Sequence, residues 1–146
     1  MPLAGDPLKA ADSFNLVTFT PVWTALTVGS GAVNEGWYNR SGDVVHWGFR
    51  LQLGTTPSGA GTTIQMDLPV AAWTGGGSGL QAAVGSFNIR DASTVNQYPG
   101  TITVFSSSGL SCAFSLASGS TRWNSSTPMA VAVDDIISGS GVYRAA

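Results

Sequence analysis

Hydrophobic and polar residues alternate with a two-residue period along much of the chain, most clearly in the stretch VVHWGFRLQL at residues 44–53. Alternate positions place Trp47 and Phe49 on one face, and His46 and Arg50 on the other. This pattern predicts a β-strand with one face in a hydrophobic core and the other toward solvent or a partner.

Short segments of the same kind, separated by glycine-rich turns, continue from Val17 onward. Pro21 interrupts the first segment, which predicts an edge strand or a strand that changes sheets. About eight strands without an intervening crossover helix favour antiparallel pairing. We therefore expect an all-β fold, an antiparallel β-sandwich with a jelly-roll-like architecture over residues 16–146, preceded by an arm at residues 1–15. The segments are LVTFTPVWTALTVG, AVNEGWYNRSGDVVHWGFRLQLG, TTIQMDLPVAAW, LQAAVGSFNIRD, GTITVFSSSG, LSCAFSLASG and PMAVAVDDIISGSGVYRAA.

The second of these segments predicts a hairpin that turns at Ser41-Gly42, because glycine supplies the positive φ of a tight turn. A two-residue loop there places Trp37 opposite His46. Trp37, His46 and Arg50 then share one semi-polar face, which we expect to be buried at a contact between subunits.

The composition limits the partners of the protein. A chain of 146 residues fits one domain. Charged residues make up only 10% of it, against about 25% in an average soluble domain. The net charge is −2 and no basic run exists, which argues against nucleic-acid binding. A surface so poor in charge favours assembly into a homo-oligomer or a larger particle.

The first residues contain no apolar segment typical of a leader peptide, and no stretch of about 18 apolar residues occurs. We expect synthesis in the cytoplasm, without export by a leader and without membrane insertion. The single cysteine, Cys112, alternates with polar residues and is predicted to be a buried thiol. One histidine, one cysteine and scattered carboxylates lack zinc-ligand spacing, so we expect no metal and no cofactor.

Candidate catalytic groups are few. A serine hydrolase would need His46 with Asp43, Asp67 or Asp91, but no G-x-S-x-G turn is present. Glycoside cleavage would need two carboxylates in one cleft, such as Asp67 with Glu35 or Asp91, and nothing in the sequence places them together. We therefore predict no catalytic residue and no enzymatic activity.

Two tryptophans, Trp73 and Trp123, lie at the ends of strands beside loops rich in glycine and serine. Exposed aromatic rings beside polar donors suit carbohydrate, and they equally suit packing against a neighbouring subunit. Both residues are candidates for glycan binding. A carbohydrate-binding module is accordingly the alternative to a purely structural role.

Several blocks of the sequence resemble the small β-rich minor tail and virion proteins of long-tailed bacteriophages that infect actinobacteria. The blocks are MPLAGDPLKAADSFN, FTPVWTALTVGSGAVNEGWYNRSGDVVHWGFRLQLG, Leu68-Pro69-Val70-Ala71 and VDDIISGSGVYRAA. The last block is also similar to the closing strand of trimeric jelly rolls of the tumour-necrosis-factor kind. The resemblance covers most of the chain, and no catalytic signature belongs to it.

The resemblance implies a non-enzymatic structural protein displayed outside a virion as a homotrimer, either at a tail or fibre tip or as a capsid decoration. Its partners would be further copies of itself, tail or major capsid protein, and host-surface carbohydrate. Residues 1–15 would form the arm that attaches the subunit to the particle. The candidate attachment residues are Leu3, Asp6, Leu8, Lys9 and Phe14.

Overall fold

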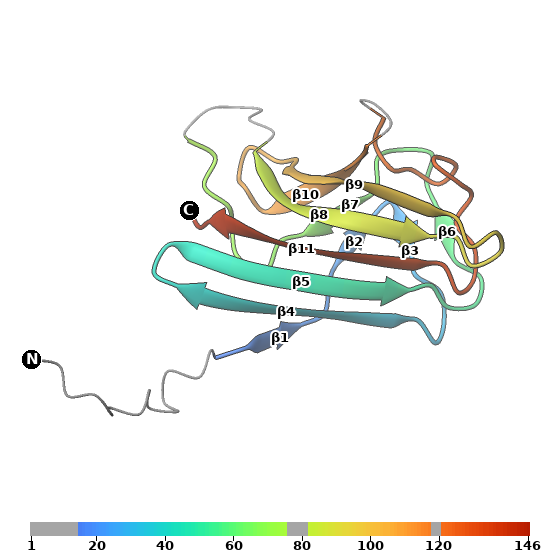
Figure 1. The fold of residues 1–146 in the computed structure, drawn as a ribbon, viewed down its shortest axis with the longest axis horizontal. Helices are drawn as coiled ribbons and strands as arrows, with labels where there is room; N and C mark the ends of the chain where they lie inside the picture. Colours follow the sequence, from blue (N-terminus) through green and yellow to red (C-terminus); the bar gives the residue numbers. More distant parts are fainter. Residues whose placement is uncertain (1–14, 76–81, 118–120) are drawn as a thin grey trace, which may run out of the picture.

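A computed structural model describes residues 15–75, 82–117 and 121–146 of the chain. These residues form strands and no helix (Figure 1), which confirms the all-β prediction and leaves no helix among them that could cross a bilayer. The strands are β1 (Val17–Phe19), β2 (Trp23–Thr24), β3 (Leu26–Thr27), β4 (Val33–Ser41), β5 (Val44–Gln52), β6 (Ser58–Gly59), β7 (Gln65–Asp67), β8 (Ala83–Arg90), β9 (Gln97–Val104), β10 (Ser111–Leu116) and β11 (Ile136–Arg144).

Nine of the strands form one antiparallel sheet in the order β1-β4-β5-β11-β8-β9-β10-β7-β2, and β3 and β6 form a small second sheet. The large sheet curls so that β10, β7 and β2 lie behind β5, β11 and β8 (Figure 1). The hydrophobic faces of the two limbs meet in the interior. The result is the jelly-roll-like antiparallel sandwich that the alternation predicts.

The N-terminal strands β1 and β2 form the two edges of the curled sheet. β1 pairs with β4 at one edge of the sheet, and after the bend at Pro21 β2 pairs with β7 at the other edge. The side chain of Asn34 on β4 stabilises the bend through two hydrogen bonds. Its amide N–H donates to the carbonyl of Pro21 at 2.9 Å, and its amide oxygen accepts from the indole N–H of Trp23 at 3.0 Å. β1 and β2 are the two edge strands of one sheet, which confirms the edge-strand alternative predicted at Pro21, and the chain does not change sheets there.

The β4–β5 hairpin forms, but the predicted register is wrong by two residues. Ser41 pairs with Val44, so the loop is Gly42-Asp43, and Trp37 lies opposite Gly48. Gly42 takes φ +59°, which suits the first loop position of a type II′ turn. A shift of two residues keeps every side chain on its predicted face, because strands alternate with a period of two.

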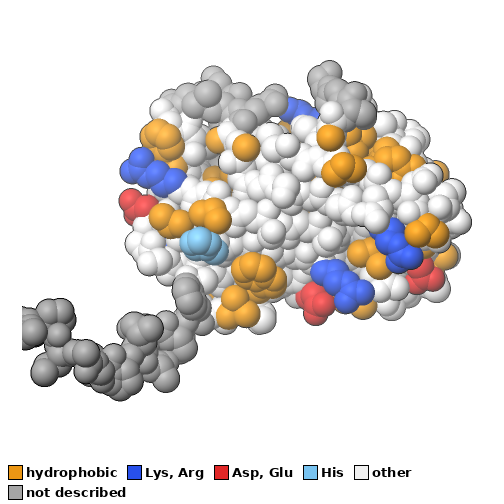
Figure 2. All heavy atoms as spheres, in the orientation of Figure 1, with side chains coloured by type: hydrophobic (Ala, Val, Ile, Leu, Met, Phe, Trp, Pro, Cys, Tyr) orange, Lys and Arg blue, Asp and Glu red, His pale blue; other side chains and the backbone are white. Residues whose placement is uncertain are grey.

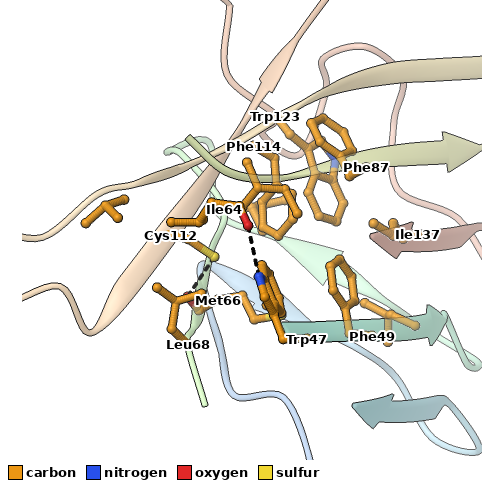
Figure 3. Packing of buried hydrophobic residues seen from close by; sticks show 14 of the residues in the cluster. Trp47, Phe49, Ile64, Met66, Leu68, Phe87, Cys112, Phe114, Trp123 and Ile137 are labelled. Carbon is orange, nitrogen blue, oxygen red and sulfur yellow. Dashed lines mark hydrogen bonds between the residues drawn. The ribbon is translucent and has the colours of Figure 1, made fainter. Parts of the chain in front are cut away.

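Aromatic side chains from both limbs fill the core (Figure 3). Phe114 on β10 contacts Phe49 and Phe87 from the opposite limb, with ring centroids 5.9 and 5.2 Å apart. Trp47 is fully buried and donates its indole N–H to the carbonyl of Val84 at 2.9 Å. Burial of these large rings supplies the apolar contact that holds the two layers together.

On the core face of β1, β4, β5, β11, β8 and β9, a phenylalanine on one strand lies opposite a glycine on the next strand. A Cβ at Gly139 on β11 would lie 2.7 Å from the ring of Phe49 on the neighbouring strand, so a larger residue there would displace the ring. The glycines therefore make room for the rings that cross from one strand to the next. The row runs Phe19, Gly36, Phe49, Gly139, Phe87 and Gly100.

Candidate functional site

The face of β4, β5, β11 and β8 that points away from the core, here called the outer face, carries the predicted contact residues. Trp37, His46 and Arg50 all lie on it and are exposed. They occupy three successive cross-strand rows, because His46 pairs with Asn39, Trp37 with Gly48, and Arg50 with Glu35. The structure thus brings the three residues to one face, but separates Trp37 from His46 by one row.

An apolar corner lies at one end of the outer face and consists of Val44, His46 and Val142, with Trp73 next to it on the far side of Arg144. Val142 pairs directly with His46, and Val44 lies diagonally beyond it on β5. In Figure 2 hydrophobic side chains adjoin the pale-blue imidazole of the single histidine. Val142 is 52% exposed and the adjoining Trp73 is 50% exposed, so this end of the outer face presents apolar surface to solvent in the single chain.

One charged pair borders this corner. The guanidinium of Arg144 lies 4.8 Å from the ring centroid of Trp73 and 4.0 Å from the carboxylate of Asp43. Both partners of the ion pair are exposed, so it contributes little to stability. Its effect is to cover part of the Trp73 ring, which leaves less of that indole free for a ligand than the sequence suggests.

Trp123 does not lie at the surface. It is fully buried, and its ring lies 5.6 Å from that of Phe114 and 6.0 Å from that of Trp23 (Figure 3). The segment after β10 folds back over the core, where the backbone N–H of Trp123 bonds to the carbonyl of Phe114 at 2.8 Å. The prediction of Trp123 as a glycan-binding residue is therefore wrong, because a core indole cannot stack on a sugar.

Next to Trp37 the outer face holds a group of small polar side chains, here called the serine tract: Ser86, Asn88, Ser138 and Ser140. They line a shallow depression of about 320 Å³ with the backbones of Phe87 and Gly139. Ser140 and Ser86 continue the cross-strand row that begins with Trp37 and Gly48. The tract was not predicted from the sequence. The feature that indicates it there is the alternation of outward serine with inward glycine in SGSG at residues 138–141.

Two carboxylates of the described residues, Asp91 and Asp135, serve the fold. Asp135 is fully buried and accepts backbone N–H groups of Ala92 and Ala132, at 3.0 and 2.8 Å, and burial raises its pKa. Asp91 accepts hydrogen bonds from Ser93 and Thr94, and these bonds lower its pKa to about 2. The described part of the chain contains no group of three or more His, Cys, Asp or Glu side chains fit to hold a metal ion.

Cys112 is buried as predicted, and its thiol donates to the carbonyl of Met66 at 3.3 Å (Figure 3). Burial raises the pKa of this thiol to about 12, so at neutral pH it stays protonated and is a poor nucleophile. The predicted attachment residues Leu3, Asp6, Leu8, Lys9 and Phe14 lie outside the described residues.

Comparison with protein-family models, with curated proteins and with solved structures finds no match to this chain.

Proposed function

We propose that this protein is a non-enzymatic structural subunit of a bacteriophage virion, displayed on the particle exterior as a homotrimer. The observation that carries the proposal is the apolar corner on a surface otherwise poor in charge. Contiguous exposed apolar side chains on a soluble domain typically mark a protein contact. The resemblance of several sequence blocks to small virion proteins suggests the kind of particle, and an all-β sandwich is compatible with it.

The surroundings of His46 support a contact more than a reaction. Its cross-strand neighbours are Asn39 and Val142, and no hydrogen bond in the described part of the chain joins the imidazole to a carboxylate or a hydroxyl. A nucleophile and an orienting acid would both have to lie within hydrogen-bonding reach. An exposed imidazole between a carboxamide and a valine instead resembles the mixed apolar and polar surface of a subunit interface.

The apolar corner makes a direct prediction for assembly. Val142→Glu places a charge at its centre, and an unpaired charge in a subunit contact costs several kcal/mol. We expect a loss of the trimer mass in sedimentation equilibrium, with an unchanged β-sheet circular dichroism spectrum. Val133→Glu is the matched control, because Val133 is 47% exposed, lies outside the corner and takes the same change of charge. A trimer that persists in Val142→Glu contradicts this contact.

The virion assignment has a separate test. Antibody fragments raised against the purified protein should label intact particles, and electron microscopy should show the label at threefold positions of the capsid or at the tail tip. Removal of residues 1–15 should release the subunit from the particle if these residues form the attachment arm. Purified particles without this chain would refute a structural role in the virion.

A further inference from the structure

The serine tract has the chemistry of a binding surface for a polar, uncharged ligand. Its side chains supply hydroxyl and carboxamide groups, and Ser86, Ser138 and Ser140 are exposed. None of these three hydroxyls makes a hydrogen bond to another described residue, while Asn88 donates to Gln97 at 2.8 Å. The hydroxyls can therefore donate to and accept from a ligand.

The arrangement of these groups follows from the sheet. Neighbouring strands lie about 4.8 Å apart, so Ser140 on β11 and Ser86 on β8 form a regular row with Gly48 on β5. The adjacent row holds Ser138 and Asn88. Because the sheet fixes the spacing, the polar groups are preorganised and lose little conformational freedom when they bind.

Trp37 borders the tract on the side of β4. A Cβ at Gly48 would lie 2.5 Å from Cζ2 of the Trp37 indole, so the ring lies against the sheet over a residue that has no side chain. Trp37 nevertheless remains 40% exposed. A ring held in this way offers apolar surface at the end of a row of hydroxyls, with little rotational freedom to lose.

No charged side chain lines the depression. Figure 2 shows the middle of this face as an uncharged area, with Arg and Asp or Glu side chains toward its borders. Arg50 is the cross-strand neighbour of both Glu35 and Ser138, and its guanidinium donates to the side-chain oxygen of Gln52 at 3.4 Å. A neutral ligand suits the depression itself, because its lining offers hydroxyl and carboxamide groups and no charged side chain to pair with an anion.

We propose that Trp37 and the serine tract bind an uncharged glycan, with the indole against a sugar ring and the serines and Asn88 bonded to its hydroxyls. The inference goes beyond the structural role, because assembly uses the apolar corner and the glycan uses the adjacent rows. It also places the glycan site at residues other than Trp73 and Trp123, which the sequence favours.

Affinity electrophoresis tests the site. The protein has a pI of about 4.9 and migrates toward the anode in a native gel at pH 8. The gel would contain, one at a time, a neutral α-glucan, β-glucan, galactan, arabinan or mannan, with the anionic polysaccharide alginate in a further gel. We expect retardation by at least one neutral polysaccharide. Retardation by none of them, or by alginate alone, would overturn the proposal.

Two tryptophan variants locate the binding. Trp37→Ala should raise the dissociation constant about tenfold, the size of one lost aromatic contact. Trp73→Ala removes another exposed indole and should change it by less than about twofold. Equal affinity in Trp37→Ala and the wild type would exclude this site, and so would a loss confined to Trp73→Ala.

A third variant tests the serine tract with Trp37 left in place, so its result does not depend on whether Trp37→Ala folds correctly. Ser138→Ala combined with Ser140→Ala removes two exposed hydroxyls, and it should weaken binding several-fold with an unchanged thermal midpoint. Unaltered affinity in this variant would contradict the tract. Val142→Glu should still bind the polysaccharide as a monomer, so failure of the assembly proposal and failure of the glycan proposal give different results. A change of oligomer mass in Trp37→Ala, without glycan binding by the wild type, would make this face a subunit contact.

Discussion

The carboxylate of Asp91 organises the turn between β8 and β9. It accepts four hydrogen bonds, from the backbone N–H and hydroxyl groups of Ser93 and Thr94. These bonds favour the ionised form and hold its pKa near 2, below the usual 3.8. A group with a lowered folded-state pKa stabilises the protein above its unfolded pKa, and this contribution is lost as the pH falls through the folded value.

Asp91→Asn tests this role. The variant should be less stable than the wild type at pH 6, and the difference in the free energy of unfolding should shrink as the pH falls from about 4 toward 2. Urea denaturation at a series of pH values measures it. Asp135 has a raised pKa and therefore the opposite sign. The charge of Asp91 is one of the lesser causes of that rise, so Asp135 adds a smaller difference of its own between the two proteins. A difference that stays constant with pH would refute the role.

At the scale of the elements, two devices shape the sheet. Glycines opposite phenylalanines let aromatic rings lie across neighbouring strands, as Gly139 does for Phe49. Asn34 on β4, the strand next to edge strand β1, bonds to Trp23 on the opposite edge strand β2 and to the carbonyl of Pro21 at the bend. A strand that changes partners leaves an interruption in the ladder, and a side-chain amide satisfies the polar groups there.

Asn34→Ala should lower the free energy of unfolding by about 1–3 kcal/mol, since it leaves the part-buried indole N–H of Trp23 and the carbonyl of Pro21 without this partner. Chemical denaturation followed by tryptophan fluorescence measures the change. Asn39→Ala is the control on the same strand. Among the described residues its amide bonds only to the exposed carbonyl of Asn15, so we expect a change of less than about 0.5 kcal/mol. Equal losses in both variants would contradict a special role for Asn34.

At the scale of the whole molecule, the two faces of the curled sheet carry different kinds of side chain. Aromatic side chains pack together on the inner face. The outer face carries the apolar corner at one end and the serine tract beside it. Assembly through the proposed contact at the apolar corner would leave the rest of the outer face available to a ligand. The Val142→Glu and Trp37→Ala variants separate these two properties, because the two residues lie in different cross-strand rows.

Much of the fold follows from local pattern. The alternation around Trp47 and Phe49 predicts both the strand and the buried face, because side-chain direction in a strand depends only on the position along it. The bend at Pro21 follows from its missing N–H. The predicted hairpin register was wrong, but Trp37 still lies on the predicted face, because a shift of two residues does not change the face to which a side chain points.

The candidate site was less accessible from sequence, because its members come from strands far apart along the chain. The sequence by itself determined which side chains point outward: Trp37, His46 and Arg50, and the serines of SGSG. Only the tertiary structure decided their neighbours. It placed β11 between β5 and β8, buried Trp123 and set Trp37 over Gly48 beside Ser140. Strand order depends on how the curled sheet closes around its core, and residue-to-residue alternation carries no information about that closure.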